Sequence, residues 1–119
     1  LSGDRPIIYG DGEQSRDFVY VRDVARANML AATSPDAPGG TFNVGRCERT
    51  SLLMLLNSLR DILGQGIEPI HEPPRAGDVR DSLADINVAR NRLGFEPQVT
   101  IDQGLEMSVD FYRSLVVNA

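Results

Sequence analysis

Arginine and aspartate side chains are concentrated in two polar segments of this sequence. The first, residues 11–17, carries Arg16, and the second, residues 74–81, carries Arg75 and Asp78. Two guanidinium groups that converge on one site suit a diphosphate, because each offers paired N–H donors to phosphate oxygens. A neighbouring carboxylate can accept hydrogen bonds from sugar or ribose hydroxyls. The other interpretation is a solvated surface with weak ion pairs, and spacing alone does not show that the two segments meet.

The first polar segment lies between two apolar stretches, residues 6–9 and 18–21, which have the composition of short strands. Gly10 and Gly12 in the intervening turn permit positive φ and let the backbone approach a ligand closely. Such a turn beside Arg16 suits an anion, but a two-stranded ribbon with a solvated tip would have the same residues. Both interpretations stay open from the residue types alone.

The composition excludes several classes of function. The chain has 119 residues, 41% hydrophobic and 24% charged, as expected for one globular domain. Its net charge of −5 argues against a general nucleic-acid surface. All 12 basic residues are arginine, which excludes a Schiff-base lysine, a P-loop lysine and a Tyr-Lys proton-transfer pair within this chain. No apolar run can cross a bilayer and no signal-peptide pattern opens the chain, which predicts a cytoplasmic protein without a membrane partner.

Two residue types that often carry chemistry are expected to be structural here. Cys47 is the only cysteine, which excludes an internal disulfide, and we expect a small half-buried apolar residue. His71 is the only histidine and lacks a second ligand in the sequence, so a structural or exposed position is expected. No metal site is therefore predicted.

The first two expected helices have clear boundaries. One covers residues 22–33, and its small, mostly alanine face suits close packing against a sheet. The other begins at Thr50 or Ser51, carries a stripe of leucines and ends at Gly64.

Two further helices are expected in the last third of the chain. Asp85 caps a helix that ends at Gly94. Thr100 caps the last helix, with Gln103 placed for a capping box. The predicted buried stripe of that helix consists of Ile101, Leu105, Val109, Tyr112 and Val116.

Short apolar runs at residues 41–45 and 67–72 predict two more strands, and residues 73–81 predict an irregular loop. No repeat or internal linker is present. Strands and helices mixed in this way predict one α/β unit with small, mixed sheets.

Several motifs carry a resemblance to a known family. Residues 9–21 read Y-G-D-G-E-Q-S-R-D-F-V-Y-V, which resembles the Y-G-D-G-x-Q-x-R-D-F-x-x-V segment of the NAD-dependent epimerase/dehydratase family, the extended short-chain dehydrogenases that act on nucleotide sugars. Similar motifs follow in the family's order: V-R-D-V-A-R-A, F-N-V-G, P-P-R-A-G-D-V and L-G-F-E-P-x-V. The R-x-G-D-V form is similar to that of UDP-glucose or UDP-N-acetylglucosamine 4-epimerases.

The resemblance implies roles for five residues. Arg16 and Arg75 would bind the diphosphate of UDP, and Asp78 would hold the ribose hydroxyls. Phe18 would help to wall the nucleotide pocket, and Glu48 stands where the family lines the uridine side.

The sequence also departs from the family. The turn at residues 46–49 reads R-C-E-R, where a small residue, often Gly, is usual. No G-x-x-G-x-x-G follows an opening strand and no Tyr-x-x-x-Lys is present. The resemblance therefore implies that residues 1–119 are the C-terminal, nucleotide-sugar-binding lobe of a longer protein and lack most of the Rossmann domain. NAD is expected in the full-length parent, and no cofactor is expected for this chain.

The implied function is to anchor a UDP-sugar for an NAD-dependent UDP-sugar 4-epimerase, whose missing N-terminal domain performs the hydride chemistry. The isolated chain is then expected to be inactive. One alternative is a stand-alone, non-catalytic binding or assembly module descended from such a lobe. Another is a lobe of a sugar-nucleotide dehydratase or decarboxylase. Besides a UDP-sugar, the expected partner is a second copy or another chain on the surface left by the missing domain.

Overall fold

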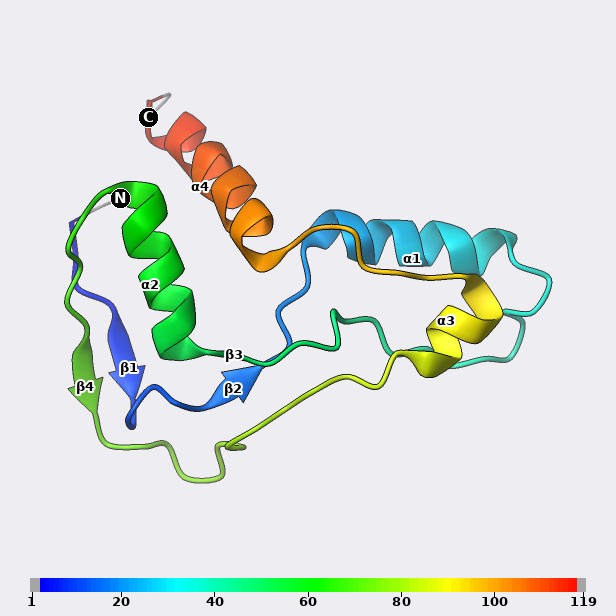
Figure 1. Ribbon diagram of the computed structural model, residues 1–119, viewed down its shortest axis with the longest axis horizontal. Helices are drawn as coiled ribbons and strands as arrows, with labels where there is room; N and C mark the ends of the chain where they lie inside the picture. Colours follow the sequence, from blue (N-terminus) through cyan, green and yellow to red (C-terminus); the bar gives the residue numbers. More distant parts are fainter. Residues whose placement is uncertain (1–2, 118–119) are drawn as a thin grey trace.

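A computed structural model describes residues 3–117, and the side chains of residues 3–115, as two groups of elements (Figure 1). The first group, here called the strand end, comprises β1 (Ile7–Tyr9), α2 (Leu52–Leu63), β4 (Ile70–Glu72) and α4 (Ile101–Val117). The second, the helix end, comprises α1 (Val21–Thr33) and α3 (Asn87–Leu93). Between them lie the two-residue strands β2 (Ser15–Arg16) and β3 (Thr50–Ser51).

The caps of α2 and α4 follow from their sequences. Ser51 Oγ accepts a hydrogen bond from the Met54 N–H at 3.1 Å, and Gly64 ends α2 in the left-handed conformation with φ 63°. At the start of α4, the Thr100 N–H donates to Gln103 Oε1 at 3.0 Å, and the Gln103 N–H donates back to Thr100 Oγ1 at 3.3 Å. These predicted boundaries are confirmed.

The predicted cap of α3 is shifted. The helix begins at Asn87, and Asp85 Oδ1 accepts from the Asn87 N–H at 2.9 Å instead of capping from the residue before the helix. In α4, Val109 of the predicted stripe is buried, but Tyr112 is largely exposed. The side chain of Val116 lies outside the described residues.

The best-packed core lies at the helix end. Its buried members are Ala27, Ile86, Ala89, Leu93 and Phe95. The alanines of α1 and α3 allow the two helices to approach closely, because a methyl group keeps little distance between backbones. The small face of α1 therefore packs against a helix, and the prediction that it packs against a sheet is wrong.

Strand pairing differs from the predicted ribbon. β1 pairs in parallel with β4, and β2 pairs antiparallel with β3, so the two arms of the expected ribbon do not pair with each other. Residues 18–20 form no strand, and Val21 already begins α1. Residues 41–45 also form no strand, because no partner strand lies beside them in the described chain. The predicted α/β class with small mixed sheets is confirmed.

Two single residues can now be compared with their predictions. Cys47 is exposed and has a φ of 60°, so the prediction of a half-buried apolar residue is wrong. Its backbone N–H instead donates to Asp17 Oδ2 at 2.9 Å, which fixes the turn with the side chain outward. His71 is exposed on β4, as predicted, and its Nδ1 lies 2.7 Å from the Gly10 carbonyl oxygen.

The described chain is open in shape. Its radius of gyration is 16.9 Å and its extents are 48 × 38 × 21 Å, whereas a compact domain of this length would have a radius of about 13.5 Å. Large apolar side chains are exposed on α1 (Val21, Met29) and on α4 (Phe111, Leu115). Within residues 3–117, no helix is both long and apolar enough to traverse a lipid bilayer.

Candidate functional site

The turn after β1 is held against the start of α2. The Leu53 N–H donates to the Gly12 carbonyl at 3.1 Å, and the Leu52 N–H donates to the Gln14 carbonyl at 3.3 Å. A Cβ on Gly12 would lie 2.8 Å from the Leu53 side chain, and the φ of Gly12 is 83°. Glycine is therefore required here by both conformation and space, and this contact sets the direction in which the chain enters β2.

Ser15 on β2 joins the two polar segments. Its N–H donates to the Arg80 carbonyl at 2.9 Å, and its carbonyl accepts from the Ser82 N–H at 3.1 Å. Its hydroxyl donates to Asp81 Oδ1 at 2.6 Å. The segments at residues 11–17 and 74–81 thus meet, which the sequence spacing did not decide.

Two ion pairs lie at this junction. Arg16 Nη2 lies 2.6 Å from Asp78 Oδ1, and the side chains of this pair are 30% and 38% exposed. Arg80 Nη1 lies 2.8 and 2.9 Å from the two oxygens of Asp11. The pKa of Asp11 is lowered by a hydrogen bond from the Glu13 N–H and then by Arg80, and Asp11 in turn raises the pKa of Arg80.

Arg75 lies over an aromatic ring. Its guanidinium carbon is 3.9 Å from the ring centre of Tyr9, a cation–π contact. Tyr9 raises the pKa of Arg75, and Asp78 and Glu72 add to that shift through their negative charge. Tyr9 was not singled out in the sequence, although its place directly before Gly10 at the end of a strand marked it as a neighbour of the turn.

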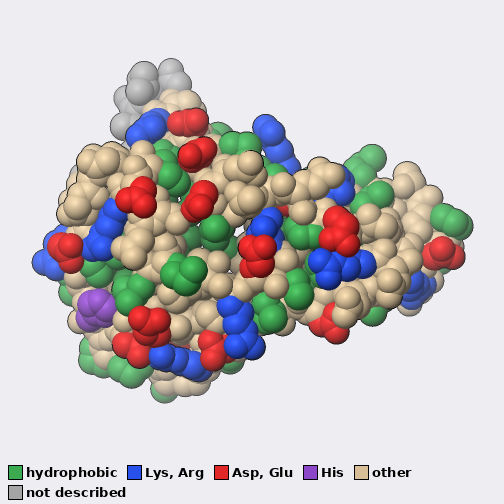
Figure 2. Space-filling view, viewed as in Figure 1, with side chains coloured by type: hydrophobic (Ala, Val, Ile, Leu, Met, Phe, Trp, Pro, Cys, Tyr) green, Lys and Arg blue, Asp and Glu red, His purple; other side chains and the backbone are tan. Residues whose placement is uncertain are grey.

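A hollow of about 190 Å³ opens between the two segments. Gln14 is buried beside it, and its Nε2 donates to the Tyr9 carbonyl at 2.7 Å. Figure 2 shows acidic and basic side chains intermingled on this face of the molecule instead of a patch of one sign. The hollow is lined by Tyr9, Gly10, Asp11, Gln14, Pro74, Asp78 and Arg80.

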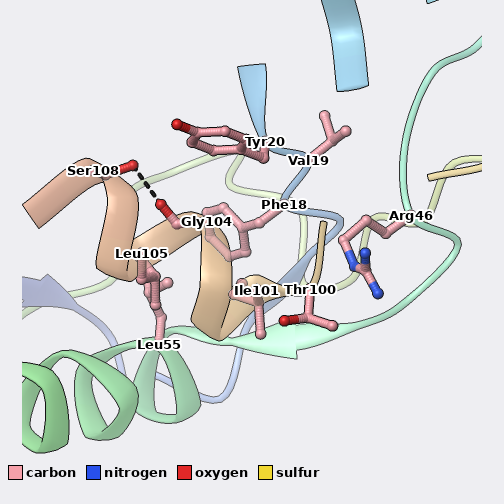
Figure 3. Close-up of a pocket in the computed structure, with 10 residues that line it drawn as sticks. All are labelled: Phe18, Val19, Tyr20, Arg46, Leu55, Thr100, Ile101, Gly104, Leu105 and Ser108. Carbon is pink, nitrogen blue, oxygen red and sulfur yellow. Dashed lines mark hydrogen bonds between the residues drawn. The ribbon is translucent and has the colours of Figure 1, made fainter. Parts of the chain in front are cut away.

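Phe18 and Glu48 belong to a second group, centred on Arg46. Phe18 and Arg46 line a cavity of about 150 Å³ at the start of α4 (Figure 3). Glu48 Oε1 accepts from Arg46 Nη2 at 3.0 Å, and Arg46 Nη1 also donates to the Val99 carbonyl. The predicted binding residues Arg16 and Asp78 are therefore joined directly, whereas Glu48 pairs with Arg46 and Phe18 lines the cavity that Arg46 also lines.

Asp17 connects these two groups, and its role was missed in the sequence. Its carboxylate accepts from the N–H groups of Arg46 at 2.7 Å, Cys47 at 2.9 Å and Ala84 at 3.3 Å. A Cβ on Gly45 would lie 2.6 Å from the same carboxylate, so glycine is needed for this approach. No sequence signal indicated this role, because its three donors are backbone groups 29, 30 and 67 residues away.

Asp23 plays a similar part at the helix end. It is 2% exposed, and its Oδ2 accepts from the N–H groups of Gln98 and Val99, both at 3.0 Å. Burial acts to raise its pKa, but the hydrogen bonds from Val99, Gln98 and Arg26 outweigh burial and lower the pKa below its usual value. This buried carboxylate fixes the segment that leads into α4.

The chain matches the model of the NAD dependent epimerase/dehydratase family over residues 1–45. It is 40% identical over 114 residues to a UDP-glucose 4-epimerase of Mycolicibacterium smegmatis. The aligned region covers 96% of this chain and 36% of that protein. It is also 29% identical over 111 residues to UDP-glucuronic acid decarboxylase 1 of Arabidopsis thaliana, covering 93% of this chain and 25% of that protein. The chain is therefore similar to this family and, over part of their length, to proteins named as UDP-glucose 4-epimerases.

Solved structures of the family have the same fold. UDP-glucose 4-epimerase of Thermotoga maritima with UDP-glucose is 41% identical with a TM-score of 0.90, over 96% of this chain and 36% of that one. UDP-glucuronic acid 4-epimerase of Bacillus cereus, in complex with UDP-glucuronic acid and NAD, is 31% identical with a TM-score of 0.87, over 92% of this chain and 36% of that one. The chain thus spans about 36% of the length of these family members.

NAD is present in such family members, but the described residues here do not form its usual site. A dinucleotide's pyrophosphate is held where a strand leads through a glycine turn into a helix N-terminus. In this chain β1 leads through Gly10 and Gly12 into β2, and α1 begins only at Val21. We therefore assign no NAD contact to the described residues. Among the same residues, no group of three or more metal-ligating side chains is found.

Proposed function

We propose that this chain is the C-terminal, nucleotide-sugar-binding portion of an NAD-dependent UDP-sugar 4-epimerase. In the complete enzyme NAD would accept and return a hydride. The residues of this chain bind and orient the substrate: Arg16 and Arg75 hold the diphosphate, and Asp78 accepts from the ribose hydroxyls. Phe18 and Glu48 border the nucleotide.

The observation that carries this proposal is the direct contact of Arg16 and Asp78. They are 62 residues apart in the sequence, yet Arg16 Nη2 lies 2.6 Å from Asp78 Oδ1. A group that binds phosphate and a group that binds hydroxyls thus lie side by side, as a nucleoside diphosphate requires. Arg75 comes from the same loop as Asp78 and has no carboxylate at salt-bridge distance in the described chain, so its charge can reach a second phosphate.

The open shape supports the fragment part of the proposal. A radius of gyration of 16.9 Å exceeds the value of about 13.5 Å for a compact domain of this length, so the chain alone is less compact than an independent domain. We propose that the exposed apolar side chains of α1 and α4 contact the rest of the longer protein or a second copy of this chain. Anchoring UDP in this chain would hold the nucleotide part of the substrate while the reacting sugar ring faces the other domain.

The similarity to a UDP-glucuronic acid decarboxylase favours a second candidate function. In that case the same residues would anchor a UDP-sugar for a lyase, and the chemistry would differ only outside this chain. A cytoplasmic location stays a prediction from the sequence.

Calorimetric titration of the 119-residue chain with UDP tests the anchoring role. Arg16→Ala and Arg75→Ala should each weaken binding by about 10- to 100-fold, because each removes a charge-assisted hydrogen bond to phosphate. Arg113→Ala is the matched control, since Arg113 pairs only loosely with Asp110 on exposed α4, at 3.6 Å. Its affinity should equal that of the unchanged chain.

Two results would contradict the proposal. One is UDP affinity that is the same in all three variants. The other is the absence of UDP binding in a chain whose thermal unfolding is cooperative, which would favour a module with a different ligand or role. A chain that binds UDP and is monomeric in sedimentation experiments would contradict self-association but leave the anchor intact.

A further inference from the structure

Each arginine of the candidate site already has a partner within the chain. Arg16 is paired with Asp78 at 2.6 Å, and Arg80 is paired with Asp11 at 2.8 Å. Arg75 rests on the ring of Tyr9. Two of these three arginines are therefore already paired with a carboxylate, and Arg75 is held by an aromatic ring instead.

The junction also carries no excess of positive charge. Its three arginines face the carboxylates of Asp11, Asp78 and Asp81, and Glu72 and Glu13 add further negative charge near Arg75 and Arg80. With no excess of positive charge, the long-range attraction that draws small anions into basic clefts is weak here. Figure 2 agrees, because it shows both signs interleaved on this face.

The ion pair of Arg16 with Asp78 limits which anions can bind to Arg16. An anion that takes Arg16 must either displace the Asp78 carboxylate or bind beside it, where the two negative charges repel. A displaced carboxylate loses its charged donor, and the hydroxyl groups of a ligand can replace that donor. The P–OH groups of inorganic phosphate and diphosphate at neutral pH lie on an anion that repels the carboxylate, whereas a nucleoside diphosphate brings neutral ribose hydroxyls attached to its phosphates.

We propose that Asp78 is a selectivity residue, which holds Arg16 in its ion pair and so rejects phosphate compounds that lack a ribose. This inference rests on the proposed binding of a nucleoside diphosphate. It adds a function for the Asp78 charge that a simple ribose contact does not need, because a neutral acceptor would also bind a hydroxyl. Exclusion of inorganic diphosphate keeps a free anion from blocking the site.

The test compares UDP with inorganic diphosphate, each titrated calorimetrically without divalent cations and at constant ionic strength. The unchanged chain should bind UDP more tightly than inorganic diphosphate. Asp78→Asn keeps the shape and one acceptor oxygen but removes the charge. It should tighten inorganic diphosphate by about tenfold, as expected for loss of one nearby negative charge, without tightening UDP.

Two matched variants separate selectivity from charge alone. Asp11→Asn removes an equal charge from the Arg80 pair, which has no assigned ribose contact, and it should tighten both ligands by a similar factor. Asp110→Asn removes the same charge on α4, where Asp110 faces Arg113, and should change neither affinity. Thermal melting confirms that each variant is folded.

The outcomes distinguish failure of the selectivity role from failure of the proposed UDP-binding function. If UDP binds the unchanged chain but Asp78→Asn leaves inorganic diphosphate unchanged, or tightens both ligands equally, the selectivity role is wrong and the anchor stands. If the unchanged chain binds inorganic diphosphate as tightly as UDP, the selectivity role is also wrong. If the folded chain binds no UDP, the proposed function itself fails.

Discussion

The two ends of this molecule use aspartate in different ways. At the helix end, Asp23 is buried and its carboxylate accepts backbone N–H groups of Gln98 and Val99. At the junction of the polar segments, Asp78 is partly exposed and its carboxylate faces the side chain of Arg16. Backbone donors cannot leave without unfolding a segment, but an exposed guanidinium can exchange one anion for another. The partner of a carboxylate, more than its charge, thus separates the structural aspartates from the one proposed to bind a ligand.

Removal of the Asp23 carboxylate should have the largest effect. Asp23→Ala leaves two backbone N–H groups without an acceptor in a buried place, which we expect to lower the free energy of unfolding by about 3 kcal/mol. Urea denaturation followed by circular dichroism measures this change. Asp23→Asn, which retains one acceptor oxygen, is the control and should lose less. A loss below about 0.5 kcal/mol for the alanine variant, as for an ordinary surface substitution, would contradict the structural role.

Asp17 should give an intermediate result, because it lies between the two regions and accepts three backbone N–H groups. Asp17→Ala is expected to lower the free energy of unfolding by about 2 kcal/mol, since its surroundings are only half-buried and water can replace part of the lost bonds. It should also weaken UDP binding, because the turn that carries Arg46 is released beside Phe18. Stability and binding are measured on the same protein sample. A variant that loses UDP affinity at unchanged stability would place Asp17 among the binding residues instead.

The fold could be predicted from the sequence where boundaries are local. Ser51, Gly64, Thr100 and Gln103 each act through atoms a few residues away, so their types were sufficient to place α2 and α4. The expected strand at residues 41–45 failed because pairing depends on a distant partner that the residue types do not specify.

The residue types of the candidate site could be predicted from the sequence, but the contacts between its distant segments could not. The residue types of Arg16 and Asp78 pointed to an anion and a hydroxyl ligand, but their contact depends on Ser15 bridging to residues 80–82, which no spacing rule gives. Asp17 was missed because its donors are backbone groups, and these are invisible in a list of side chains. Their ligand and roles stay predictions until binding is measured.

Acid should distinguish the two kinds of aspartate further. The pKa of Asp23 is lowered in the folded state, so its contribution to stability is present above its unfolded value near 3.8 and is lost as pH falls through the lower folded value. The unchanged chain should therefore lose stability in acid more steeply than Asp23→Asn. The pKa of Asp11 is lowered as well, but Asp11 is exposed, so Asp11→Asn should leave the acid slope nearly unchanged. Equal slopes in the unchanged chain and Asp23→Asn would contradict the assignment.

The smallest stability effect is expected at Asp78, where the proposed functional effect is largest. Its pair with Arg16 is partly exposed, and such pairs contribute about 0.5 kcal/mol or less to folding. The free energy of unfolding of Asp78→Asn, measured in urea, should therefore lie within about 0.5 kcal/mol of that of the unchanged chain. The preference of this variant between UDP and inorganic diphosphate should nevertheless change. If it instead loses as much stability as Asp23→Ala, the Arg16–Asp78 pair is a structural clamp. The altered anion preference would then follow from a disturbed junction, and the distinction between backbone-held and side-chain-held aspartates would not hold.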